Sequence, residues 1–197
     1  IFLLLQGFPR VAAQDTAPVP PGHAAWVTAL KFSPDGKTLL SSGGDRTVKL
    51  WDVKSGNLLF SVMAHEVKVQ AIDFAGDGKI FASIGENGDN AVKIWKAADG
   101  ALLQSFPVET FSTLTSLKFS PDGGLLAVGS VDAVLRVFST GDWKPAFELA
   151  MPQDGRDHHV NDLDFSPDGK TLVTADGDAG GHDGNGHLDG SGSQECV

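Results

Sequence analysis

One unit of sequence recurs four times along this chain, and the repetition constrains the fold more than any local propensity does. Each copy begins with a short apolar run that ends in phenylalanine and is followed by a turn, SPDG in three copies and AGDG in the second. The phenylalanines are spaced by 42, 45 and 46 residues and are Phe32, Phe74, Phe119 and Phe165. Self-similarity at such a period is typical of folds that stack one supersecondary unit repeatedly.

The first copy predicts a four-stranded antiparallel sheet. Its first turn is tight because Pro34 presets φ, Asp35 can bond its own backbone and Gly36 tolerates positive φ. The runs between the turns are apolar and β-branched, which favours strands. The expected strands are Val27 to Phe32, Thr38 to Gly43, Thr47 to Trp51 and Leu58 to Met63. Four strands in about 40 residues correspond to one blade of a β-propeller.

The aromatic residues of the third strands also align. Trp51, Trp95 and Phe138 occupy equivalent positions, and the first copy opens with Gly-His and closes with Trp-Asp. In these features residues 22–178, some four fifths of the chain, resemble the WD-repeat (β-transducin-like) family. The resemblance implies an all-β, incomplete WD-repeat β-propeller of three full four-stranded blades and half of a fourth. The expected blades span about residues 22–63, 64–107, 108–151 and 155–178.

A partial ring of this kind leaves apolar surface uncovered. Closed propellers contain roughly four to eight blades, and the resemblance to this family implies a ring of seven. Three and a half blades would expose the apolar flanks of the first and the fourth blade, which favours self-association through the open blade edges. The alternative is that a longer protein is the functional unit.

The resemblance also implies a buried hydrogen-bonded chain within a blade. In the family it joins a His before the first strand, a Ser or Thr in the second, an Asp in the second turn and a Trp in the third. An imidazole can bond a carboxylate and a hydroxyl at once, while an indole N–H only donates. The matching residues are His23, Ser41, Asp45 and Trp51 in the first blade and His65, Ser83, Asp89 and Trp95 in the second.

The third copy departs from this pattern. Thr110, Val128 and Phe138 stand where His, Ser and Trp are expected, and only Asp132 remains. Removing several polar partners together avoids leaving one of them buried and unsatisfied. We therefore expect the third blade to keep its apolar frame and to lose the network.

Composition excludes several classes of function. The net charge is −10 without a basic stripe, which argues against binding nucleic acid. No apolar run approaches the ~18–20 residues of a membrane span. Cys196 is the single cysteine, so neither a disulfide framework nor a Cys-rich metal site is expected. His23, Ser41 and Asp45 could suggest a hydrolase, but the repeat gives them a structural role and no G-x-S-x-G motif is present. We expect neither catalytic residues nor a cofactor.

The two ends of the chain read differently from the repeats. Residues 1–13 resemble the remnant of a signal peptide, with an Ala-Ala before the cut, and predict an exported, bacterial protein, periplasmic or extracellular. The alternatives are a disordered leader or an upstream strand in a cytoplasmic protein. Residues 14–21 form a Pro-rich linker. Residues 179–197 are rich in Gly and Asp and are expected to be disordered. The abrupt break of the pattern favours a truncated or frameshifted coding sequence.

The family resemblance implies a non-catalytic scaffold that binds other proteins or peptides on one face of the propeller. Residues that precede a first strand or follow a turn aspartate would meet the partner. They are Trp26, Arg46, Lys68, Asn90, Thr113 and His159. Trp26 and Arg46 are the strongest candidates, because Trp and Arg often anchor interfaces. The structural alternative for Trp26 is packing against the next blade.

Two other functions remain open. The chain could be the propeller domain of a longer exported enzyme or electron-transfer protein, although no C-x-x-C-H or phosphate-binding loop is present. The acidic tail could bind calcium through oxygen ligands. Its spacing matches neither the EF-hand loop nor the Gly-rich nonapeptide repeat. The candidate ligands are Asp176, Asp178, Asp183, Asn185 and Asp189.

Overall fold

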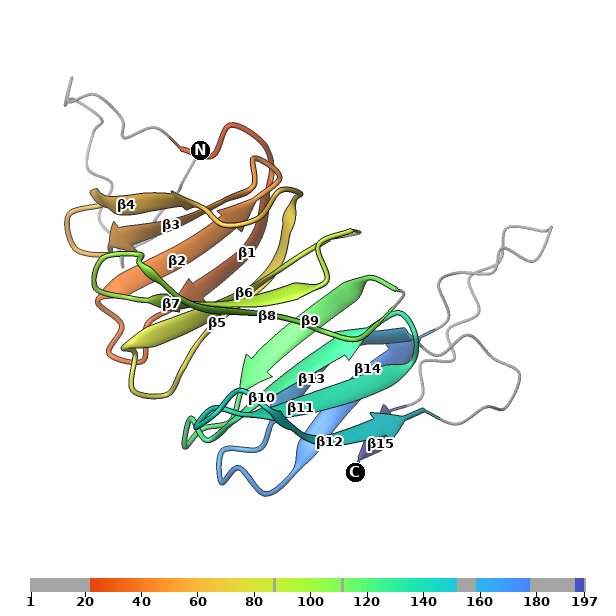
Figure 1. Cartoon of the computed structure of the whole chain (residues 1–197). Helices are drawn as coiled ribbons and strands as arrows, with labels where there is room; N and C mark the ends of the chain where they lie inside the picture. The colour runs from red at the N-terminus through yellow and green to blue at the C-terminus, as the bar shows by residue number, and fades with distance from the viewer. Residues whose placement is uncertain (1–21, 87, 111, 152–158, 178–193, 197) are drawn as a thin grey trace, which may run out of the picture.

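The computed structural model describes residues 22–86, 88–110, 112–151, 159–177 and 194–196 (Figure 1). These residues form strands and turns, without a helix and hence without a helical membrane span. Three antiparallel sheets have four strands each and a fourth has three. We number these sheets as blades one to four in chain order. The prediction of an all-β chain with three full blades and a partial fourth is confirmed.

The strands of blades one to three pair in sequence order. Blade one contains β1 (Val27–Phe32), β2 (Thr38–Gly43), β3 (Thr47–Asp52) and β4 (Leu58–Met63). Blade two contains β5 (Val69–Phe74), β6 (Ile80–Gly85), β7 (Ala91–Lys96) and β8 (Leu102–Pro107). Blade three contains β9 (Leu114–Phe119), β10 (Leu125–Ser130), β11 (Val134–Ser139) and β12 (Pro145–Ala150). Blade four contains β13 (His159–Phe165), β14 (Leu172–Gly177) and β15 (Gln194–Cys196).

Each turn between a first and a second strand ends on a glycine with φ between 68° and 73°. Side chains rarely adopt this left-handed region, which explains the glycine of the SPDG and AGDG turns. The glycines are Gly36, Gly78, Gly123 and Gly169.

The first strands of successive blades are neighbours, because β1 contacts β5, β5 contacts β9 and β9 contacts β13 (Figure 1). Two threonine hydroxyls join these strands across blade boundaries. Thr28 donates to the Val69 carbonyl at 2.6 Å, and Thr115 donates to the Val160 carbonyl. The blades are therefore held together along their first strands as well as through their faces.

The hydrophobic core is divided into layers that lie between blades. Leu40, Val48 and Leu50 of blade one pack with Ile72, Phe81 and Trp95 of blade two. Equivalent layers join blade two to blade three and blade three to blade four. The second strand of blade two, β6, is buried on both faces because blade one covers one face and blade three the other, so its sequence is apolar without alternation.

The C-terminal tail contributes a strand that the sequence did not predict. Gln194–Cys196 pairs antiparallel with β14, at Val173, Thr174 and Ala175. The expectation of disorder over residues 179–197 is therefore wrong for these three residues. The physical reason is the unpaired edge of β14, whose N–H and C=O groups are satisfied when an extended segment adds to it. The tail carboxylates proposed as calcium ligands, apart from Asp176, lie outside the described residues, as do the signal-peptide remnant and the linker.

We expect Phe81→Ala to destabilise the chain by about 3–5 kcal/mol, because it removes a fully buried ring from a cluster of four aromatic side chains and opens a cavity there. The Phe81 ring stacks on Phe60 and Trp95 at 6.3 and 6.1 Å and meets the edge of Phe74 at 6.2 Å. Urea unfolding measures the change. Phe147→Ala is the matched control, since this ring is 49% exposed, and equal losses in the two variants would contradict the layered core.

Candidate partner-binding face

A chain of side-chain hydrogen bonds runs through blade one. Asp45 Oδ1 lies 2.9 Å from His23 Nδ1, and His23 Nε2 lies 2.8 Å from the Ser41 hydroxyl. The Trp51 indole donates to the same hydroxyl at 2.8 Å. With Nδ1 protonated, every member of the chain has a partner of the right kind. The loop before β1 is thereby fixed to the turn between β2 and β3.

Blade two contains the same chain. His65 Nδ1 lies 2.8 Å from Asp89 Oδ2, and His65 Nε2 lies 2.8 Å from the Ser83 hydroxyl. The Trp95 indole donates to Ser83 at 2.9 Å. Burial lowers the pKa of His65 and outweighs the opposing hydrogen bond to Asp89. The imidazole is therefore held neutral, as an acceptor from Ser83 and a donor to Asp89.

The turn aspartate of blade one is held ionised. Burial opposes its charge, but hydrogen bonds from His23, Thr47 and the Ala24 amide outweigh this effect and lower the pKa of Asp45 to about 2. A carboxylate that accepts several hydrogen bonds stabilises the fold wherever it is charged. The stability that Asp45 contributes is present above about pH 4 and is lost as the pH falls through about 2.

Blade three lacks the His–Ser–Asp–Trp chain, as expected, but it has a different polar network that the sequence analysis did not predict. Arg136 donates from Nη2 to Asp132 Oδ2 at 2.8 Å and from Nη1 to the Ser130 hydroxyl at 3.0 Å. Thr110 donates to Asp132 at 2.7 Å from the histidine position. Burial opposes the charge of Asp132, but Arg136, Ser130 and Thr110 lower its pKa to about 2. A bidentate guanidinium thus replaces the imidazole as the main partner of the turn aspartate.

Arg136 was not predicted, because its position is not one of the His, Ser, Asp and Trp positions of the family pattern. A signal was present in the sequence. Lys49, Lys93 and Arg136 occupy the same place in β3, β7 and β11, as one basic residue within an otherwise apolar strand. A charged residue at a buried position needs a partner, and the nearby turn aspartate is the obvious one.

One face of the molecule is built from these fixed turns. In blades one to three, the residue before the first strand accepts a backbone hydrogen bond from the turn between the second and third strands. Gly44 donates to Trp26, Glu86 to Lys68 and Val131 to Thr113, each at 2.9 Å. Trp26, Lys68 and Thr113 therefore lie in connected loops at one end of the blades, whereas His159, which was expected before the first strand of blade four, is the first residue of β13.

Trp26 is exposed and held in place at once. Its side chain is 69% exposed, and its ring lies against Gly44. A Cβ on Gly44 would stand 2.9 Å from Trp26 Cε2, so only glycine permits this contact. The next glycine matters for the network, since a Cβ on Gly43 would meet His23 Nδ1 at 2.7 Å. Trp26 belongs to the face rather than to a contact with the next blade.

Arg46 is exposed beside the same turn and adopts a φ of 70°. The other four candidates are more constrained. Lys68 forms an ion pair with Glu86 at 2.9 Å, and Asn90 donates to the Thr110 carbonyl at 2.9 Å. Thr113 and His159 are half-buried. Asn90 thus ties blade two to the following loop, and Trp26 and Arg46 are the candidates with the most accessible side chains.

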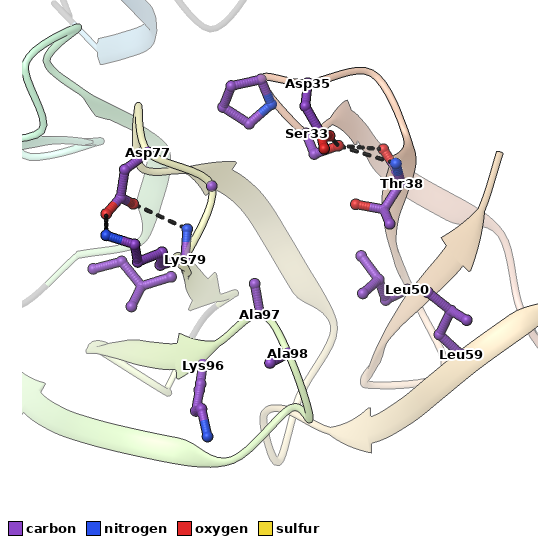
Figure 2. Close-up of a pocket in the computed structure, with 13 residues that line it drawn as sticks. Ser33, Asp35, Thr38, Leu50, Leu59, Asp77, Lys79, Lys96, Ala97 and Ala98 are labelled. Atoms are coloured by element: carbon purple, nitrogen blue, oxygen red, sulfur yellow. Dashed lines mark hydrogen bonds and ion pairs between the residues drawn. The ribbon is translucent and has the colours of Figure 1, made fainter.

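A pocket of about 690 Å³ lies at the other end of blades one and two (Figure 2). Leu50, Leu59, Ile80 and Ala97 supply apolar surface. Its lysines are paired: Lys79 lies 3.2 Å from Asp77, and Lys96 lies 3.0 Å from Asp99 outside the lining. The turns between the first and second strands form its rim, so it is separate from the face that carries Trp26.

Comparisons with known proteins agree with this architecture. The family model "WD domain, G-beta repeat" matches residues 17–52 and 56–96, and the model "Anaphase-promoting complex subunit 4 WD40 domain" matches residues 117–182. The fold is that of an incomplete WD40 β-propeller. Within the part of the propeller that the structure describes, no group of three or more His, Cys, Asp or Glu side chains is placed to hold a metal ion.

Several relatives are similar to most of this propeller. Cilia- and flagella-associated protein 52 of Chlamydomonas reinhardtii is 33% identical over 62% of the chain and 21% of its own length. COMPASS component SWD3 of Saccharomyces cerevisiae is 27% identical over 79% of the chain and 53% of its own length. Small ribosomal subunit protein RACK1y of Oryza sativa is 30% identical over 77% of the chain and 45% of its own length. The chain therefore spans about a fifth to about half of these relatives. All three are eukaryotic and give no support to a bacterial exported origin.

We expect His65→Gln to flatten the pH dependence of stability below neutrality. Burial lowers the pKa of His65 below its ordinary 6.5, so the unfolded chain binds the proton more readily than the folded chain. This group therefore favours unfolding as the pH falls below about 6.5. Urea unfolding between about pH 7.5 and 5.5 measures the slope. His159→Gln, outside the network, is the control, and an unchanged slope in His65→Gln would contradict the assignment.

A double-mutant cycle tests the coupling within blade two. Ser83→Val leaves the Trp95 indole and His65 Nε2 without a partner, which costs about 1–3 kcal/mol. Trp95→Phe removes one of these orphaned groups. We expect the double variant to lose less free energy of unfolding than the sum of the singles, by at least ~0.5 kcal/mol. Val128 and Phe138 of blade three already form this combination. Additive losses in urea unfolding would contradict the coupling.

Proposed function

We propose that the chain is a non-catalytic protein-interaction module that binds an extended segment of a partner protein on the face around Trp26 and Arg46. The observation that carries the proposal is a large aromatic side chain that is exposed but fixed by its contact with Gly44. An immobilised aromatic residue loses little conformational entropy on binding, and this favours affinity.

The surroundings of Trp26 indicate the chemistry of the partner. An apolar side chain would cover the indole ring, and a carboxylate would pair with the Arg46 guanidinium. The polar side chains of the His–Asp networks are engaged in holding the loops, so their role is to make the face rigid. In support, two relatives carry names that place them in larger assemblies, a COMPASS component and a small ribosomal subunit protein.

Selection of random peptides on the immobilised chain tests the proposal, with dissociation constants measured by titration calorimetry. We expect Trp26→Ala to weaken the selected peptides by about 10- to 100-fold, as at an interface hot spot. Leu59→Ala is the matched control, because this side chain is 53% exposed but lines the pocket at the other end.

Gly44→Ala separates the fixed geometry of Trp26 from its mere presence. The added Cβ must displace the indole ring, so we expect weaker peptide binding although Trp26 itself is retained. Equal affinities for the wild type, Trp26→Ala and Gly44→Ala would show that binding, if present, uses another surface.

A further inference from the structure

The flank of blade one that faces away from blade two is apolar, and no element of the described part of the chain covers it. Val27, Leu30 and Phe32 are 42%, 54% and 54% exposed. Their equivalents in blade two, Val69, Ile72 and Phe74, and in blade three, Leu114, Leu117 and Phe119, are at most 6% exposed because a preceding blade packs on them. The exposed flank of blade one therefore has the composition of a surface that another blade covers.

Blade four has the complementary flank, which likewise packs on no further blade among the residues that the structure describes. Val173 is 37% exposed, whereas its equivalents Leu40, Ala82 and Ala127 are fully buried against the following blade. Ala175 is also exposed, where Ser42 and Ile84 are fully buried. Blade four thus exposes the flank on which a following blade would pack. Blade one exposes the opposite flank, with which a blade packs on the one before it.

The charges along the first strands alternate in sign. The residue before each repeated phenylalanine is Lys31, Asp73, Lys118 and Asp164 in chain order. Lys31 pairs with Asp73 at 2.9 Å, and Lys118 pairs with Asp164 at 3.0 Å. Odd blades therefore carry a lysine and even blades an aspartate at the same position.

Asp73 shows what an aspartate at this position does when a third blade follows. Its Oδ1 pairs with Lys31, and its Oδ2 accepts the Phe119 amide of blade three at 2.9 Å. Asp164 has the same lysine partner on the preceding blade, but its side chain is 65% exposed against 3% for Asp73. Blade three supplies a backbone amide to Asp73. Blade one of another molecule can supply the equivalent amide to Asp164.

We propose that a second copy of this chain covers both flanks, with blade one of each copy packed on blade four of the other. In this arrangement Asp164 accepts the Phe32 amide of the second copy and lies beside its Lys31. Two head-to-tail contacts close a ring with two-fold symmetry. The ring contains six full and two partial blades, and a total of eight lies within the range of known propellers. An even number of blades keeps the alternation of lysine and aspartate in phase around the ring, whereas an odd number would place two like charges side by side.

Sedimentation velocity of the purified chain over a range of concentrations tests this assembly. The expected result is a species of twice the chain mass that dissociates on dilution. We expect Leu30→Asp to raise the dimer dissociation constant by about tenfold or more, because it places an unpaired charge in the apolar contact. Leu103→Asp is the matched control, since Leu103 is 52% exposed on β8, away from both flanks, and should leave the dimer unchanged.

A zero-length carbodiimide cross-link then identifies the contact. Unlabelled and ¹⁵N-labelled chains are mixed, and mass spectrometry should find Lys31 of one copy joined to Asp164 of the other. A folded chain that stays monomeric at about 100 µM would overturn the proposal and would assign the flanks to further blades of a longer protein. Higher-order association without the Lys31–Asp164 link, or insensitive to Leu30→Asp, would overturn it as well.

Discussion

Contact between neighbouring blades is the interaction on which the rest of the structure depends. A single four-stranded sheet of this sequence has apolar side chains on both faces, so it cannot bury its core alone. Phe81 and Trp95 are buried because blade one covers them, and Leu126 and Phe138 because blade two does. On the first strands, Ile72 and Phe74 are buried against blade one, whereas their equivalents Leu30 and Phe32 are exposed because no described element covers them. The burial of a first strand therefore depends on the neighbouring blade rather than on the residue type.

The polar networks have a different role: they hold the loops at one end of the blades in a fixed position. Blades one and two place an imidazole between a carboxylate and a hydroxyl, and blade three uses the guanidinium of Arg136. Both solutions satisfy the turn aspartate and leave it ionised. A buried network of this kind is favourable only when each member is paired, and in blade three, which has Val128 and Phe138 at the serine and tryptophan positions, Arg136 and Thr110 pair with the turn aspartate.

Much of the fold followed from the repeated spacing of phenylalanine and from the turn sequences. The predicted bounds of β1, β2 and β4 agree with the structure, because Pro, Asp and Gly fix the turns locally. The candidate site was less predictable. The two loops that carry Trp26 and Arg46 could be named from the repeat, but the contact of the indole ring with Gly44 depends on two segments meeting in space. The bond from Asn90 to the Thr110 carbonyl joins two blades in the same way.

The sequence by itself determined the blade as a unit, its number of repeats and the polar residues of its first two networks, because these rest on turns and on spacing within about 45 residues. Only the tertiary structure decided which apolar residues are buried, because the burial of a side chain depends on whether a neighbouring blade packs on it. It also decided that Arg136 replaces the imidazole, and that residues 194–196 supply the third strand of blade four. The lysine and aspartate residues of the first strands are visible in the sequence, yet their pairing across blades exists only in the assembled stack.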